Sequence, residues 1–255
     1  MRSLRSRTCF VSGPLTRNKH AMPDSFEPRA RSAGDVTHAV AKAAIGSLPF
    51  VGAAGVELFS YVVSAPHERR REAWMKQVGD DLAKLRDTRG VNLDTLRDDD
   101  SFVDAVVAAT QAAIRTADVA KHAALRNAIL NTALPFAPEE AVRQTYIRLI
   151  DELNAWHLRF LDLFDDPNEW QRMNDKTFPT LYAGGLSHVV EHAYPEVKSR
   201  QNLYDQWWRD LYTRGLVSTD SLHVMMSGHG LLGRRTTDFG REFVKFVREP
   251  VAPAR

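Results

Sequence analysis

The chain has a single cysteine, Cys9, among its 255 residues. One cysteine excludes an internal disulfide framework and a cysteine-based zinc site, because both need several thiols. Residues 35–150 contain no β-rich run and no glycine-rich phosphate loop, so Rossmann, P-loop and kinase chemistry have no motif here. We therefore expect no cofactor and a reducing, cytoplasmic environment.

Apolar runs long enough to span a membrane are missing as well. The most apolar stretch covers the 16 residues 50–65, between two prolines, with Glu57 as its only charge. A membrane-spanning helix needs about 20 apolar residues, so we expect a buried apolar helix over 48–63. The alternative is constitutive or triggered membrane association, in which the apolar helix and the arginines after it meet an anionic lipid surface. The residues of this alternative are Phe50, Val51, Leu58, Phe59, Arg69, Arg70 and Arg71.

The net charge of +2 is unevenly distributed. Residues 1–32 hold seven basic and two acidic residues, a net +5, which leaves −3 for the rest of the chain. A protein that binds the phosphate backbone normally has a concentrated basic surface, so this pattern disfavours nucleic acid. Residues 1–34 lack a helical period and contain three prolines, which predicts a disordered basic tail, with a transit peptide as the alternative.

From Asp35 onward the apolar residues recur at helical spacing. We expect a helix capped by Ser64 whose core-facing stripe consists of Trp74, Val78, Leu82 and Leu85. Two further helices are expected over 98–118 and 119–135. A long helical pattern then follows and is interrupted at Asn154, which can cap a new helix. Residues 35–153 therefore predict a helical bundle domain.

After Asn154 the order of elements changes. The sequence predicts helices over 155–167, 179–195 and 199–215, and a short strand over 216–219. Two strand-like pieces around the turn residues Ser227, Gly228 and Gly230 predict a small β-hairpin, and a last helix is capped by Thr237. This is the order of a winged-helix module. We therefore expect a mainly α protein with a winged-helix-like domain over 154–248 and a tail over 249–255.

Two short motifs belong to this C-terminal part. The first is Arg214-Gly215-Leu216, and the second is a T-x-x-G-x-x-F pattern formed by Thr237, Gly240 and Phe243. With the apolar helical part before them, the arrangement over roughly 35–248 resembles the abortive-infection alpha type of bacterial proteins. The resemblance implies a role in phage defence, through protein contacts or triggered membrane association, and brings no catalytic residues.

His188, Glu191 and His192 form H-x-x-E-H, the spacing of inverzincin metallopeptidases. The two histidines are four residues apart on one helix face, so the spacing permits zinc. Such a site also needs a further carboxylate and a large surrounding domain, whereas only roughly 60 residues follow the motif. We therefore expect a structural histidine pair with no metal and no catalysis, and keep a zinc-dependent hydrolase as an outside alternative.

Two kinds of partner fit a winged-helix-like domain. For DNA, its third helix and wing would offer Arg200, Gln201, Arg209, Arg214, Arg234 and Arg235. Two aspartates on the same helix oppose phosphate contact. For protein, the adjacent Trp207 and Trp208 exceed what one core stripe needs, so one of them is expected as an exposed anchor. We therefore expect a non-enzymatic protein that binds a protein partner or itself, with a DNA-binding regulator as the alternative.

Overall fold

The computed structural model of the chain describes residues 53–179 and 182–250, with the backbone alone for residues 53–66. The predictions for the tail at 1–34, for Phe50 and Val51, and for residues 251–255 lie outside these residues. The described residues are mainly helical and contain one small antiparallel sheet, which confirms the predicted mainly α class. The elements are α2 (Ala53–Arg89), α3 (Leu93–Arg97), α4 (Asp100–Arg115), α5 (Val119–Thr132), α6 (Glu140–Glu152), α7 (Ala155–Asp165), α8 (Pro167–Met173), β1 (Ala183–Gly184), α9 (Leu186–Ala193), the 3-10 helix η1 (Pro195–Val197), α10 (Gln201–Thr213), β2 (Met226–Ser227), α11 (Gly228–Leu231) and α12 (Asp238–Val247).

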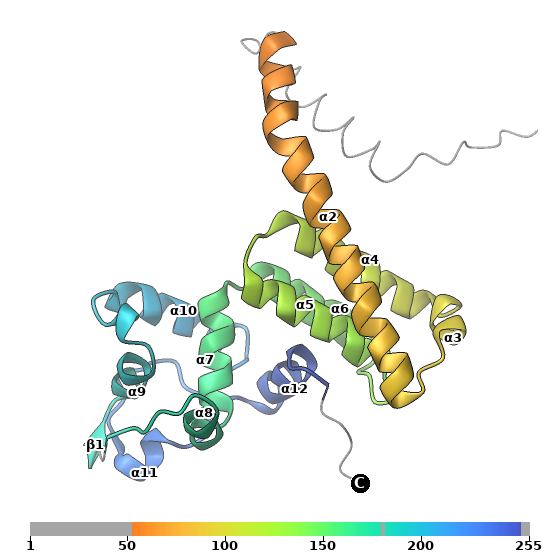
Figure 1. The fold of residues 1–255 in the computed structure, drawn as a ribbon. Coiled ribbons are helices and arrows are strands. Elements are labelled where there is room, and N and C mark those ends of the chain that lie inside the picture. The colour runs from red at the N-terminus through yellow and green to blue at the C-terminus, as the bar shows by residue number, and fades with distance from the viewer. Residues whose placement is uncertain (1–52, 180–181, 251–255) are drawn as a thin grey trace, which may run out of the picture. The chain divides into compact units, whose positions relative to one another are not determined.

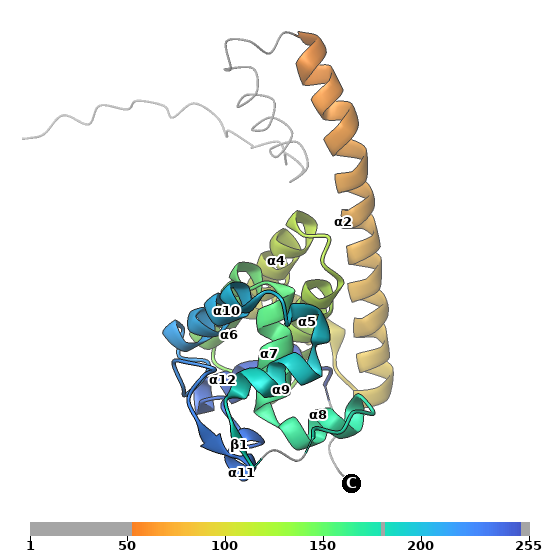
Figure 2. The same cartoon turned by 90° about the vertical axis from the view of Figure 1, so that its left-hand side faces the viewer.

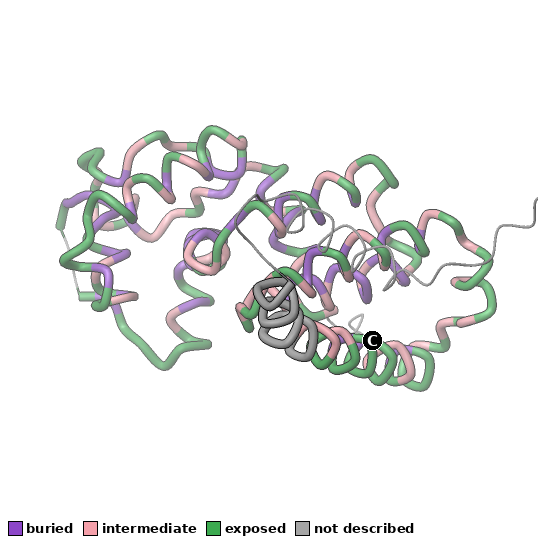
Figure 3. Tube along the Cα trace, turned by 90° about the horizontal axis from the view of Figure 1, so that it is seen from above, coloured by how far each residue is buried: buried purple, intermediate pink, exposed green. Residues whose placement is uncertain are grey.

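The chain divides into two compact units, residues 1–58 and 59–255. The second unit contains residues 59–153 of the predicted bundle domain and the whole of the predicted C-terminal part. Within it, α7 and α12 lie between the helices α4, α5 and α6 and the group α9, α10 and α11 (Figure 1). The buried core runs through both parts of this unit (Figure 3).

α2 runs unbroken through Ser64 and Pro66, so the predicted N-cap at Ser64 is wrong. A proline inside a helix removes one hydrogen bond and costs about 3 kcal/mol. Good helix formers such as Ala65, Glu68 and Arg69 surround Pro66 and favour continuing the helix. None of the helices within the described residues is both long and apolar enough to cross a membrane.

The bundle forms around a stripe on α2 and the small residues of α4. Trp74, Val78 and Leu85 are buried, as predicted. The indole nitrogen of Trp74 donates to the Thr110 hydroxyl of α4 at 3.0 Å, and its ring meets His122 of α5 edge-on. Figure 2 shows α2 running alongside α5. A wide aromatic residue thus joins α2 to two helices at once.

The joint between the bundle and the C-terminal part is the predicted cap at Asn154. Its side chain accepts hydrogen bonds from the backbone nitrogens of Trp156 and His157. The contact is reciprocal, because Nδ1 of the His157 ring accepts a hydrogen bond from the backbone nitrogen of Asn154 at 3.0 Å. This reciprocal capping box confirms that one helix ends and α7 begins here.

The predicted β-hairpin is wrong. β2 pairs antiparallel with β1, which precedes it by about forty residues, with Ala183 opposite Ser227 and Gly184 opposite Met226. The expected turn instead forms the short helix α11, because the Ser227 hydroxyl caps it by accepting from the Gly230 nitrogen. A separate bridge joins Val217 to Thr236.

The helix predicted over 179–195 is also shorter than expected. The described part of this segment holds β1 and then α9, which begins at Leu186. Glycine is a poor helix former, and Gly184 and Gly185 stand at the point where the helix should have continued. A Cβ added to Gly185 would lie 2.8 Å from the Leu222 carbonyl oxygen. The close approach of this loop therefore fixes the start of α9.

Candidate interaction surface

The two short motifs of the C-terminal part contact each other directly. The Thr237 hydroxyl donates to the Gly215 carbonyl at 2.6 Å, and the Thr237 nitrogen donates to the Leu216 carbonyl at 3.1 Å. Gly215 has a φ of +70°, the left-handed C-cap expected from the sequence. A Cβ on Gly240 would lie 2.0 Å from the Leu216 oxygen, so only glycine fits there. The motif residues therefore join the end of α10 to the start of α12.

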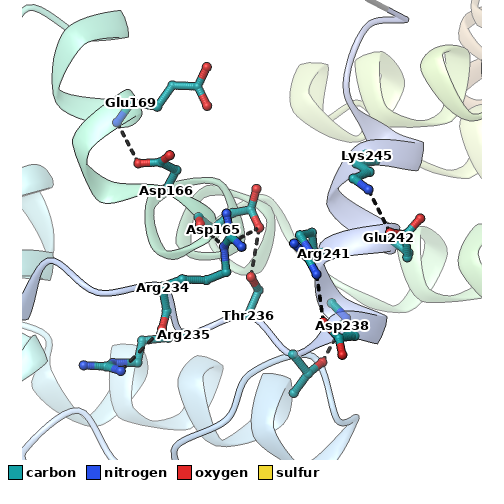
Figure 4. Close-up of polar contacts among 12 residues, drawn as sticks. Asp165, Asp166, Glu169, Arg234, Arg235, Thr236, Asp238, Arg241, Glu242 and Lys245 are labelled. Atoms are coloured by element: carbon teal, nitrogen blue, oxygen red, sulfur yellow. Dashed lines mark hydrogen bonds and ion pairs between the residues drawn. The ribbon is translucent and has the colours of Figure 1, made fainter. Parts of the chain in front are cut away.

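A buried carboxylate holds the segment before α12 in place (Figure 4). Asp165 ends α7 and is 5% exposed. It accepts hydrogen bonds from the Thr236 hydroxyl at 2.8 Å and from Arg248 at 3.2 Å. The Arg234 Nε donates to the Asp165 backbone carbonyl at 2.8 Å. Because a buried charge must be compensated, this cluster is a structural tie between α7 and residues 234–248.

The residues predicted to contact DNA fall into two groups. Arg234 belongs to the cluster just described. Arg235 donates to the Gly230 carbonyl and to the Met226 sulfur, and burial lowers the pKa of its guanidinium. Arg214 lies 3.6 Å from the Glu152 carboxylate. Arg200, Gln201 and Arg209 lie at or on α10 and are exposed, and Arg234 is exposed as well.

The H-x-x-E-H residues each make a separate contact. The His188 ring accepts from the backbone nitrogen three residues before it at 3.2 Å, and the His192 ring donates to the carbonyl of Thr177 at 2.9 Å. Glu191 accepts from the Tyr204 hydroxyl of α10 at 2.9 Å, and burial together with this carboxylate raises the pKa of Tyr204. No three His, Cys, Asp or Glu side chains gather as a metal site among the described residues. Glu191 and His192 thus tie α9 to its neighbours, and His188 caps the start of α9.

The membrane alternative involves residues before Trp74 in α2. Leu58 and Phe59 lie in its helical backbone, and their side chains are outside the described residues. Arg69 and Arg70 are exposed, whereas Arg71 is partly buried. The exposed arginines precede the buried stripe of α2 by one turn.

The two adjacent tryptophans have different environments. Trp208 is 1% exposed and donates its indole hydrogen to the Thr219 carbonyl at 2.9 Å. Trp207 is only partly buried and stacks on Trp156 of α7, with ring centroids 5.4 Å apart and planes 4° from parallel. Trp207 is therefore the tryptophan that solvent reaches, and it does so as half of a pair.

An arginine and a leucine extend this pair. The guanidinium carbon of Arg159 lies 4.6 Å from the centroid of the Trp156 ring, a cation–π geometry. Leu203 stands one turn before Trp207 on α10 and is 47% exposed. We call Trp156, Arg159, Leu203 and Trp207 the aromatic surface. Sequence reasoning missed Trp156 and Arg159, because only the packing of α7 on α10 brings them to Trp207.

Comparisons of the chain with protein families, curated proteins and solved structures found no match. The contacts within the molecule are therefore the basis for inferring its function.

Proposed function

We propose that the protein acts by binding another protein through the aromatic surface, and that it does so without catalysis. The observation that carries this proposal is the partly exposed Trp156–Trp207 stack with Arg159 beside it. Tryptophan and arginine are the side chains that most often dominate binding energy at protein interfaces, where truncation of one costs about 2 kcal/mol or more.

The aromatic surface is held rigid from beneath. The Trp156 ring meets Phe160 and Tyr194 edge-on, at centroid distances of 6.3 Å and 5.6 Å. The Tyr194 hydroxyl donates to the backbone carbonyl of Arg159, which fixes α7 to the end of α9. Side chains that are already ordered lose little entropy on binding. A partner would therefore gain from contact area without first arranging the anchor residues.

The exposed leucine supports the same interpretation. Leu203 exposes an aliphatic side chain to solvent beside Trp207, outside the buried face of α10. Around the stack, Arg159 lies 3.8 Å from Glu196, and both side chains are about half exposed. A surface ion pair of this kind contributes little on its own. Arg159 and Glu196 can thus give up their mutual ion pair and pair with charged groups of a partner at the rim of an interface.

For the biological setting we propose phage defence, on the strength of the resemblance to abortive-infection alpha-type proteins. The support is that the two motifs carrying the resemblance form one joint, through Thr237, Gly215 and Leu216. We also propose a winged-helix identity for the C-terminal part. The order of α7, α9 and α10, the Val217–Thr236 bridge and the final α12 supports it.

The binding proposal is tested by L203E, with Y212E as the matched control. Leu203 and Tyr212 are 47% and 44% exposed on the same helix, but Tyr212 lies away from the Trp207 side. The tagged chain is cross-linked in bacterial cells during phage infection, and its adducts are identified by mass spectrometry. We expect an adduct protein that the unmodified chain and Y212E recover and L203E loses. Recovery of the same proteins with L203E would contradict the proposal.

A DNA-binding regulator is the second candidate, supported by the exposed amide and guanidinium groups of Gln201 and Arg209 on α10. These groups can read base edges in the major groove. Binding to duplex DNA would weaken steeply with added salt. A salt-titrated mobility shift with R200A/R209A as comparison separates this candidate from the first, since flat and negligible binding rejects it.

Two further alternatives have direct tests. Membrane association through α2 predicts flotation with anionic liposomes, and the triple change R69E/R70E/R71E should abolish it. A zinc hydrolase predicts about one equivalent of bound metal that H188A removes. Absence of flotation, or a metal content that H188A leaves unchanged, would eliminate the respective alternative.

A further inference from the structure

The outward face of α4 carries apolar side chains that the fold does not need. Val103 and Val107 are one turn apart and are 40% and 48% exposed. Ile114 follows two turns later on the same face and is partly buried. The opposite face of α4 faces the core, where Ala109 is fully buried. Exposed valine is a poor helix former, so these residues are not explained by the stability of α4.

The apolar face continues toward α2. Thr110 lies on the same side of α4 as Val103 and Val107, and its hydroxyl accepts the hydrogen bond from Trp74. Met75, the residue after Trp74, is 56% exposed. The helix that contacts Thr110 thus also offers an apolar side chain to solvent.

Acidic groups flank these valines. Asp100 and Asp104 are exposed on the same side of α4, and neither side chain makes an ion pair or hydrogen bond with any described residue. Asp100 complements the helix dipole in the first turn. Asp104 lies beyond that turn and has low helix propensity. The only basic residue of α4, Arg115, is at its far end and is paired with Asp151 at 2.6 Å.

We propose that this face of α4 docks a basic amphipathic helix of a partner protein. We call it the α4 face and define it as Asp100, Val103, Asp104, Val107 and Ile114. Its apolar residues have the spacing with which one helix packs against another. Lysine or arginine beside the partner's apolar stripe would meet the two aspartates. The same carboxylates repel phosphate, so an anionic membrane or a nucleic acid does not fit. This surface does not involve the aromatic surface and is independent of the proposed function.

The test uses a fluorescent helical peptide of about five turns, with leucines on one face and lysines on both sides of them. Binding to the full chain is followed by anisotropy. V103S/V107S should weaken binding at least about tenfold, because the leucines lose their apolar contacts. D100N/D104N should weaken it about threefold to fivefold at low salt, and high salt should remove that difference. A peptide with glutamate in place of lysine should bind far more weakly.

The control variant is V119S/F136S, which removes two exposed apolar side chains elsewhere in the same bundle. It should bind the basic peptide like the unmodified chain, and thermal unfolding should show that all variants remain folded. Equal binding by V103S/V107S, or by the acidic peptide, overturns the proposal. Light scattering provides another check: a dimer that V103S/V107S dissociates would show that a second copy, and not a basic partner helix, occupies the α4 face.

Discussion

Substituting alanine for Gly240 should destabilise the protein strongly, because the new methyl group would meet a backbone atom. The added Cβ would lie 2.0 Å from the Leu216 carbonyl oxygen and 2.9 Å from its carbon. Neither atom can rotate away, so α12 must move from the end of α10. That movement stretches the two hydrogen bonds by which Thr237 holds Gly215 and Leu216.

The expected loss combines two contributions. Overpacking of a close contact costs about 1–3 kcal/mol, and two weakened hydrogen bonds cost about 1 kcal/mol each. A loss of about 3 kcal/mol in a unit of this size lowers Tm by about 6–12 °C. Urea and thermal unfolding followed by circular dichroism measure both quantities.

Gly79 provides the matched control. It lies inside α2, and a Cβ added there has no atom within 4 Å. G79A should therefore stabilise the protein by up to about 1 kcal/mol, because alanine is the better helix former. A G240A protein whose stability is within about 0.5 kcal/mol of the unmodified chain, the range of ordinary surface changes, would refute this account of the joint between α10 and α12.

Three further predictions concern the ties between elements. D165N should destabilise the fold by about 2 kcal/mol, which is less than the loss of a fully buried pair because Arg234 and Arg248 are partly exposed. D162N should cost about 1 kcal/mol or less, because Asp162 is an exposed partner of Arg248. Equal urea midpoints for the two variants would contradict the buried tie. Burial lowers the pKa of His157, despite the opposing charge of Asp210, so the unfolded chain binds more protons than the folded one. Stability should therefore fall as pH drops below about 6.5, with a smaller fall in H157Q. Parallel pH profiles of the two proteins in urea titrations would reject this assignment. N154A should lower the free energy of unfolding by about 1 kcal/mol through loss of the α7 cap, and it should raise hydrogen exchange in the first turn of α7. Unchanged exchange there would count against the cap.

Local signals in the sequence identified much of the fold. The Trp74–Leu85 stripe, the cap at Asn154 and the cap at Thr237 are each determined by residues within a few positions of one another. Side-chain capping and helical spacing act over one or two turns, so a sequence displays them directly. The short sheet could not be predicted in this way, because β1 and β2 are distant in the chain and Ser227 carries a competing helix-cap signal.

The candidate interaction surface was predicted only in part. The adjacency of Trp207 and Trp208 suggested that one of them is exposed, but which one depends on the Thr219 carbonyl that accepts from Trp208. Trp156 belongs to a different helix, and its stacking on Trp207 depends on how α7 crosses α10. Contacts of this kind follow from tertiary packing, which helical spacing alone does not specify.

The most direct test of the central claim is site-specific photo-cross-linking on α10 in living cells. A photoreactive phenylalanine derivative is placed at Leu203 or at Tyr212, two positions of similar exposure on different sides of the helix. We predict one discrete protein adduct from position 203 and none from position 212. Adducts of the same mass and yield from both positions, or no adduct from position 203, would contradict binding through the aromatic surface.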